Sequence, residues 1–168
     1  MTTSHPNLHR IAGEAVAGAV EQGLTVATAE SLTAGMVAAV LADIPGASAM
    51  LQGGVMSYQN SVKADVLGVP RDLLDAVGAV DGQVAAAMAA GARRICGADI
   101  GVSTTGVAGP EPHGGKDVGA VYVGIATADG SAAYPYSFDG NRLEIRALAC
   151  AAALERLLEV LAPGGYRA

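Results

Sequence analysis

Aromatic residues are scarce in this sequence: its 168 residues include no tryptophan, one phenylalanine and five tyrosines. Because 51% of the residues are nevertheless hydrophobic, the core has to be built mainly from alanine, valine, leucine and isoleucine. Such a core suits helices that pack closely on a sheet. The chain is long enough to bury a core of its own, and we predict a single domain over residues 1–168.

Positive charge is also scarce. Ten lysines and arginines stand against sixteen aspartates and glutamates, which gives a formal net charge of −6, and no basic run occurs. Nucleic acids and anionic membranes are held largely by clusters of lysine and arginine. We therefore expect neither nucleic acid nor a membrane as a partner.

Long apolar runs and metal-ligand spacings are missing as well. The apolar runs are broken by glycine, aspartate or proline well short of a membrane span, and the first ten residues, MTTSHPNLHR, lack the apolar segment of a signal peptide. The two cysteines, Cys96 and Cys150, fall within expected helices, which favours reduced thiols packed in the core. These features predict a cytoplasmic protein.

Hydrophobic periodicity predicts alternating helices and strands. Helices are expected at residues 5–22, 33–42, 60–67, 81–96 and 142–161, and another helix is expected to begin within residues 69–72. Strands are expected at residues 24–28, 50–58, 99–105, 120–127 and 132–138.

The connections between these strands predict the topology. The first three strands are joined through helices and can run parallel by right-handed crossovers. The links into and out of strand 120–127 contain no helix, so this strand should run antiparallel to its neighbours. The predicted fold is a three-layer α/β/α sandwich on a five-stranded mixed sheet with one strand antiparallel.

Three polar or glycine-rich segments, residues 28–31, 57–63 and 103–110, fall at the ends of expected strands. Ligands of open α/β sheets bind at the carboxyl ends of strands, so the three segments are expected to form one site. Each segment also has a plainer explanation. Ser31 could be a helix cap, Lys63 a solvated lysine, and Gly106 and Gly109 ordinary turn residues.

Taken together, these segments resemble the CinA C-terminal domain family, which includes stand-alone nicotinamide mononucleotide deamidases. The resemblance extends from Leu8 to about Leu161. It is carried by TAES at 28–31, GGVMSYQNSVK at 53–63, TTGVAGP at 104–110, VGAVYVG at 118–124, and Asn141-Arg142 with Arg146. The resemblance implies hydrolysis of nicotinamide mononucleotide to nicotinic acid mononucleotide and ammonia, with no metal or organic cofactor, in a homo-oligomer.

The chain departs from the family pattern at three places. Residues 33–35 read Thr-Ala-Gly where Thr-Gly-Gly is usual, Asn141 replaces a common aspartate, and the glycines at 114–115 are displaced within the long loop 106–118. These departures concern the fine positioning of the site more than the fold.

Amide hydrolysis needs a nucleophile, a base and donors that stabilise the oxyanion. Ser31 supplies a hydroxyl, and backbone N–H groups at the start of the following helix could be the donors. Lys63 is the candidate base, because partial burial can lower the pKa of its amine. Tyr58 could orient or relay the proton, and the matching positions in the family make the serine and lysine its catalytic core. Glu30 could orient Lys63 or cap the helix.

A serine, histidine and aspartate triad is not expected, because none of the three polar segments contains a histidine. His5 and His9 lie in the first helix, and His113 lies in the long loop.

The substrate phosphate needs cations or N–H groups, and Arg142 and Arg146 lie one helical turn apart. Threonine hydroxyls and glycine backbone in the third segment suit close approach by a nucleotide. The expected substrate-binding residues are Glu30, Thr33, Gly35, Gly54, Asn60, Thr104, Thr105, Gly106, Gly109, Arg142 and Arg146.

Two other functions fit the same pattern: a nucleotide-binding module that has lost catalysis, and a structural or partner-binding domain. The intact set of Ser31, Tyr58 and Lys63 favours the hydrolase.

Overall fold

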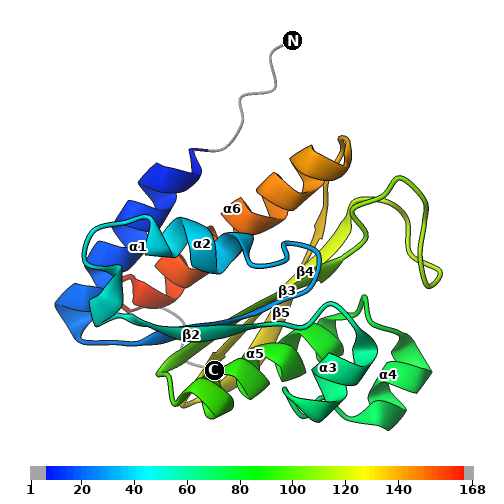
Figure 1. The fold of residues 1–168 in the computed structure, drawn as a ribbon, viewed down its shortest axis with the longest axis horizontal. Helices are drawn as coiled ribbons and strands as arrows, with labels where there is room; N and C mark the ends of the chain where they lie inside the picture. Colours follow the sequence, from blue (N-terminus) through cyan, green and yellow to red (C-terminus); the bar gives the residue numbers. More distant parts are fainter. Residues whose placement is uncertain (1–6, 165–168) are drawn as a thin grey trace.

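The computed structural model describes residues 7–164, which form a sheet between two layers of helices (Figure 1). The strands are β1 (Val26–Glu30), β2 (Leu51–Met56), β3 (Ile100–Gly106), β4 (Ala120–Thr127) and β5 (Gly130–Ser137). The helices are α1 (Leu8–Gln22), α2 (Met36–Ala42), α3 (Asn60–Asp65), α4 (Arg71–Val77), α5 (Gly82–Cys96) and α6 (Arg142–Leu161), with a 3-10 turn, η1 (Ala47–Ala49). Within these residues, no helix has both the length and the apolar character that crossing a bilayer requires.

The strand order is β2-β1-β3-β4-β5. β1 pairs in parallel with β2 and β3, whereas β4 is antiparallel to both β3 and β5. This confirms the predicted three-layer fold with one antiparallel strand. It also places β1 and β3 side by side in the middle of the sheet, with their carboxyl ends at one edge.

The two layers bury two main apolar clusters and a smaller third one. α1, α2 and α6 cover one face of the sheet, and α3, α4 and α5 lie on the other (Figure 1). The larger cluster joins α1 and α6 to the sheet, and a second cluster lies between α4, α5 and β1. Alanine, valine, leucine and isoleucine dominate both clusters, as the composition predicts.

Small residues let α5 lie close to the sheet. A Cβ atom at Gly101 would collide with the carbonyl oxygen of Ala89, and one at Gly124 with the carbonyl oxygen of Ala85. The Ser103 hydroxyl donates to the same Ala85 carbonyl over 2.5 Å. This close approach explains how the molecule forms a dense core with so few aromatic side chains.

Both cysteines are free thiols. Cys150 is fully buried in the larger cluster, where burial and the nearby charge of Glu30 raise the pKa of its thiol to about 12. Cys96 is half-buried and lies beside Gly53. Cys150 therefore lacks the exposed, low-pKa environment of a reactive cysteine.

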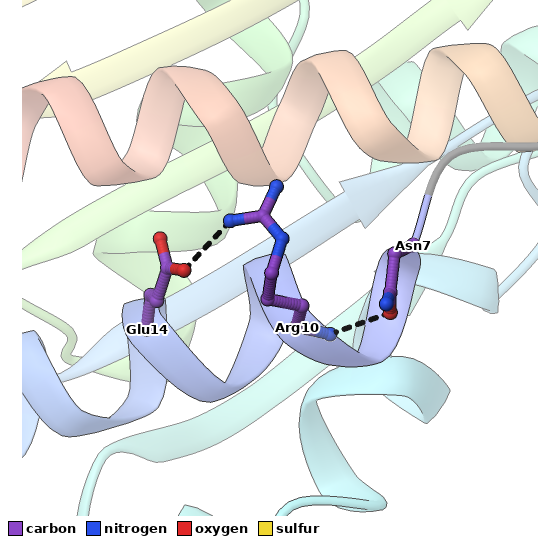
Figure 2. A network of polar contacts seen from close by, with 3 residues as sticks. All are labelled: Asn7, Arg10 and Glu14. Atoms are coloured by element: carbon purple, nitrogen blue, oxygen red, sulfur yellow. Dashed lines mark hydrogen bonds and ion pairs between the residues drawn. The ribbon is translucent and has the colours of Figure 1, made fainter.

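Side-chain caps mark the first turns of α1, α5 and α6. The Asn7 side chain accepts a hydrogen bond from the Arg10 backbone N–H at 3.0 Å, and the Arg10 guanidinium donates to Glu14 one turn later at 2.7 Å (Figure 2). The Asp81 side chain caps α5 by accepting a hydrogen bond from the Gln83 N–H. Asn141 caps α6 in a reciprocal capping box with Glu144, so the residue that replaces the usual aspartate still performs this role.

The boundaries of β4 and α6 agree with the prediction, but those around Ser31 do not. β1 runs from Val26 to Glu30 rather than over 24–28, because Glu30 still pairs with Met56 and Thr104. α2 begins at Met36 rather than at residue 33. The intervening residues 31–35 form a turn, and Ser31 is therefore not the cap of α2.

Candidate active site

A pocket of about 590 Å³ opens at the carboxyl ends of β1 and β3. The first turns of α3 and α6 and the loop between β3 and β4 lie around this edge, on the right-hand side of Figure 1. The lining residues come from five segments: 31–32, 58–63, 79–80, 105–113 and Arg142. The three polar segments recognised in the sequence thus meet in one place, as predicted.

The pocket gathers eight of the predicted site residues and leaves six outside its lining. Those in the lining are Ser31, Tyr58, Asn60, Lys63, Thr105, Gly106, Gly109 and Arg142. Those outside it are Glu30, Thr33, Gly35, Gly54, Thr104 and Arg146.

Ser31 and Lys63 are in contact on the wall of the pocket. Ser31 is the first residue after β1, and Lys63 Nζ lies 3.2 Å from its Oγ atom. Lys63 is in α3, and its amine also donates to the carbonyl oxygens of Ser57 at 2.7 Å and Tyr58 at 3.2 Å. These carbonyls precede the helix, so the side chain extends back toward the helix start, as helical side chains do.

The Lys63 amine is buried without a carboxylate partner. The residue has 0% exposure, and no ion pair to it is found among residues 7–164. Desolvation lowers the pKa of Lys63 from 10.5 to about 8. A neutral amine has two N–H groups and one lone pair, which match two carbonyl oxygens and the Ser31 hydroxyl.

Glu30 caps α2 and does not contact Lys63. Its carboxylate accepts hydrogen bonds from the backbone N–H groups of Gly35, Val37 and Ala38 at 2.9 to 3.0 Å. The backbone N–H groups of Gly35, Val37 and Ala38 are therefore not available as oxyanion donors, because they are already bound to Glu30. Of the two roles considered for Glu30, orienting Lys63 and capping the helix, the structure shows the second.

Thr33 and Thr104 belong to the same buried network. The Thr33 hydroxyl donates to Glu30 at 2.7 Å and lies 2.7 Å from the Thr104 hydroxyl. Because the Thr33 proton is directed at the carboxylate, the Thr104 hydroxyl has to donate to Thr33. Both threonines have 0% exposure, so their hydrogen bonds hold the turn after β1 from the buried side.

The turn after β1 contains an unusual backbone conformation. Ala34 has a φ of 51°, and it is the one non-glycine residue with positive φ among those described; Gly35 follows at 93°. The left-handed region favours glycine, because a Cβ atom there is crowded by the backbone. The alanine that departs from the Thr-Gly-Gly pattern thus occupies a position that suits glycine.

We expect Ala34→Gly to raise the free energy of unfolding by about 0.5 to 1 kcal/mol, because relief of the left-handed alanine exceeds the added entropy of the unfolded chain. Urea denaturation of the purified variant measures this change. Ala39→Gly is the matched control: Ala39 is an exposed residue inside α2, and its replacement should lower stability by about 1 kcal/mol. Equal losses in both variants would contradict the strain at Ala34.

Tyr58 and Arg142 meet at the mouth of the pocket. Arg142 donates to the Tyr58 hydroxyl at 2.9 Å and to the Gly109 carbonyl oxygen at 2.7 Å. Both side chains are exposed. The Tyr58 hydroxyl thus points to the arginine, while its backbone carbonyl accepts from Lys63. Tyr58 orients the lysine through its main chain in this structure.

Arg146, one turn further along α6, faces a different direction. Its guanidinium donates to the carbonyl oxygens of Leu32 at 2.8 Å and Thr33 at 2.9 Å. The two arginines named as candidates for binding the phosphate are thus separated: Arg142 lines the pocket and Arg146 binds the turn that carries Ser31.

The glycines of the site are required by close packing. A Cβ atom at Gly106 would lie 2.7 Å from the Ala120 carbonyl oxygen, and Gly109 has a φ of 85° with Val118 close by. At Gly54 a Cβ atom would collide with the Thr28 hydroxyl, so β1 and β2 also approach closely there. The β1–β2 register also shifts between Val26 and Ala27, which makes the pairing irregular at that point.

Several lining residues were not foreseen, among them Leu32, Gln59, Ala79, Val80 and Glu111. The Thr105 hydroxyl donates to the Ala79 carbonyl oxygen at 2.7 Å, which fixes the segment before α5 against the end of β3. For the wall formed by the loop 106–118, the polar segment 103–110 was the signal in the sequence. Nothing in the sequence pointed to Ala79 and Val80, which lie in a connection between helices.

The chemistry available in the pocket is that of a hydroxyl beside an amine. Residues 7–164 contain no group of three or more histidine, cysteine, aspartate or glutamate residues placed to hold a metal ion. His113 also lines the pocket, but it is an exposed residue of the loop.

The sequence matches one protein family over nearly all of its length. The model of the CinA C-terminal domain matches residues 8–161. A CinA-like protein of Frankia casuarinae is 47% identical over 143 residues, which are 85% of this chain and 33% of that protein. A putative competence-damage inducible protein of Bacillus pumilus is 44% identical over 141 residues, covering 84% and 34%. The chain spans about a third of the length of the curated relatives that it matches.

Solved structures with the same fold cover the chain more completely. The competence/damage inducible protein CihA of Agrobacterium tumefaciens has a TM-score of 0.87 at 35% identity, covering 94% of this chain and 98% of that one. A CinA superfamily protein of Klebsiella pneumoniae has a TM-score of 0.89 at 28% identity, with coverage of 93% and 98%.

Proposed function

Because this chain belongs to the CinA C-terminal domain family, we propose that it is an amidohydrolase that converts nicotinamide mononucleotide to nicotinic acid mononucleotide and ammonia. The observation that carries the proposal is the contact between Ser31 Oγ and Lys63 Nζ, 3.2 Å apart at the pocket wall. A hydroxyl is a weak nucleophile until a base takes its proton, and a desolvated amine beside it is such a base.

The pKa of Lys63 suits this task. With a pKa of about 8, roughly one tenth of the amine is neutral at pH 7, whereas an ordinary lysine would be neutral in about 1 molecule in 3,000. Burial thus raises the population of the competent base by more than a hundredfold.

Acylation begins when Ser31 Oγ attacks the carboxamide carbon and its proton passes to Lys63 Nζ. The carbonyl π electrons move onto oxygen, and the protonated lysine is then a cation beside the developing negative charge. As the tetrahedral intermediate collapses, Lys63 gives the proton to the amide nitrogen. The C–N bond breaks, ammonia leaves, and an ester links Ser31 to the nicotinoyl group.

Deacylation repeats these steps with water. The water oxygen attacks the ester carbon as its proton passes to Lys63. The ester C–O bond then breaks, and the proton returns to Ser31 Oγ. The sum is amide plus water to acid plus ammonia, and it consumes no further reactant.

The pocket has room for a mononucleotide, since ligand sites of this size class range from about 300 to 1,000 Å³. Arg142 is the one arginine in the lining and lies at its mouth, so we assign it to the phosphate. A guanidinium binds phosphate through paired N–H groups. Gly109 lies beside Arg142, and its carbonyl oxygen accepts a hydrogen bond from that guanidinium.

The proposal is tested by incubating the purified protein with nicotinamide mononucleotide. We expect ammonia and nicotinic acid mononucleotide to form in equal amounts without added metal or cofactor. Binding of the nucleotide without ammonia release would favour the alternative, a nucleotide-binding module of the same fold. Absence of both would leave the domain without a nucleotide function.

A further inference from the structure

The turn that carries the proposed nucleophile, residues 31–35, is held from two sides. The Glu30 carboxylate binds N–H groups on the α2 side of the turn. The Arg146 guanidinium binds carbonyl oxygens on its other side, those of Leu32 and Thr33. The turn is therefore tied to α2 through one charged group and to α6 through the other.

Packing reinforces the link to α6. Leu32 is 4% exposed and belongs to a small apolar cluster with Ile145 and Ala149, which flank Arg146 on the helix. The residue after Ser31 is thus fixed to α6 by its side chain and by its carbonyl oxygen. The Ser31 N–H donates to the Thr104 carbonyl oxygen at 3.0 Å, which anchors the start of the turn to β3.

We propose that Arg146 is a positioning residue that keeps the Ser31 hydroxyl against the Lys63 amine by holding the carbonyl oxygens of the next two residues. The inference rests on the proposed function, since it assigns Arg146 to the nucleophile and not to the phosphate. A planar guanidinium can bind two carbonyl oxygens at once, whereas a lysine ammonium in its place acts as a single point charge.

The arrangement predicts different kinetics for the two arginines of α6. Loss of Arg146 lets the turn relax, and a displacement of about 1 Å at a reacting atom costs about 100-fold in rate. Its effect should fall on kcat, while KM changes less than about 3-fold. Loss of Arg142 should instead raise KM for nicotinamide mononucleotide by about 10-fold or more, because charge-assisted contacts to the substrate are removed.

The experiment compares Arg146→Met, Arg146→Lys and Arg142→Met with the parent, using nicotinamide mononucleotide and its dephosphorylated riboside. For both Arg146 variants we expect kcat to fall about equally with either substrate, and added guanidinium ion to restore part of the rate in Arg146→Met. Arg142→Met should discriminate against the phosphorylated substrate alone. A rise in KM confined to the nucleotide in Arg146→Met, or an unchanged kcat, would overturn the proposal.

Hydrogen exchange gives a readout that does not depend on turnover. Amides of Gly35 and Val37 should exchange faster in Arg146→Met than in the parent, while β4 amides stay protected. If the parent releases no ammonia, the proposed function fails, and exchange alone decides about Arg146: faster exchange in the turn supports its hold on this segment, and unchanged exchange overturns it.

Discussion

Ser31→Ala is expected to lower kcat for nicotinamide mononucleotide by at least about 1,000-fold, because removal of a nucleophile leaves only the contribution of binding and electrostatics. The fold should be retained. Ser31 is not a helix cap, and its N–H bond to Thr104 is a backbone contact that alanine also makes. Continuous measurement of ammonia release gives the rate, and calorimetry with the nucleotide tests whether binding persists.

Ser61→Ala is the matched control. Ser61 is exposed on α3, two residues before Lys63, and does not line the pocket. We expect it to turn over at the parent rate. If Ser31→Ala hydrolysed the amide as fast as Ser61→Ala, the hydroxyl at position 31 would not be the nucleophile.

The topology was predictable because it follows from connections. Helical crossovers imply parallel strands, and the helix-free links around 120–127 imply the antiparallel strand β4. The start of α2 was not predictable from local sequence. Residues 33–42 favour helix by composition, but Ala34 and Gly35 have positive φ, and the N–H groups of the first turn bind a carboxylate that comes from β1. The tertiary contact of Glu30 decided this boundary.

The site was predictable to the level of segments, because strand ends converge at one edge of the sheet. It was not predictable at the level of side-chain direction. Spacing placed Arg142 and Arg146 one turn apart and suggested a shared anion. The structure directs Arg142 to Tyr58 and Arg146 to the backbone of Leu32 and Thr33. A sequence pattern does not say where the carbonyl oxygens of an irregular turn point. The backbone partners of Arg146 are therefore visible only in the structure.

The pH dependence of turnover should identify Lys63 as the base. Its pKa is lowered to about 8 by burial, and the protonated amine cannot accept the Ser31 proton. In the parent, kcat/KM should therefore fall about tenfold per pH unit below pH 8 and level off above it. An exposed lysine with its usual pKa would place this limb more than two units higher.

Lys63→Arg is expected to remove this limb and to lower the rate by about 1,000-fold, because a guanidinium stays charged near neutrality and accepts no proton. Position 63 has 0% exposure and arginine is bulkier than lysine, so Lys63→Gln is measured as well, as a neutral replacement. Both variants should still bind the nucleotide.

Lys116→Arg is the matched control. Lys116 is the other lysine of the chain and lies outside the pocket lining, so the rate of this variant and the acidic limb of its pH profile should match the parent. Single-turnover rates from mildly acidic to alkaline pH decide the matter. Full activity in Lys63→Arg, or an acidic limb that persists in Lys63→Gln, would show that another group takes the serine proton.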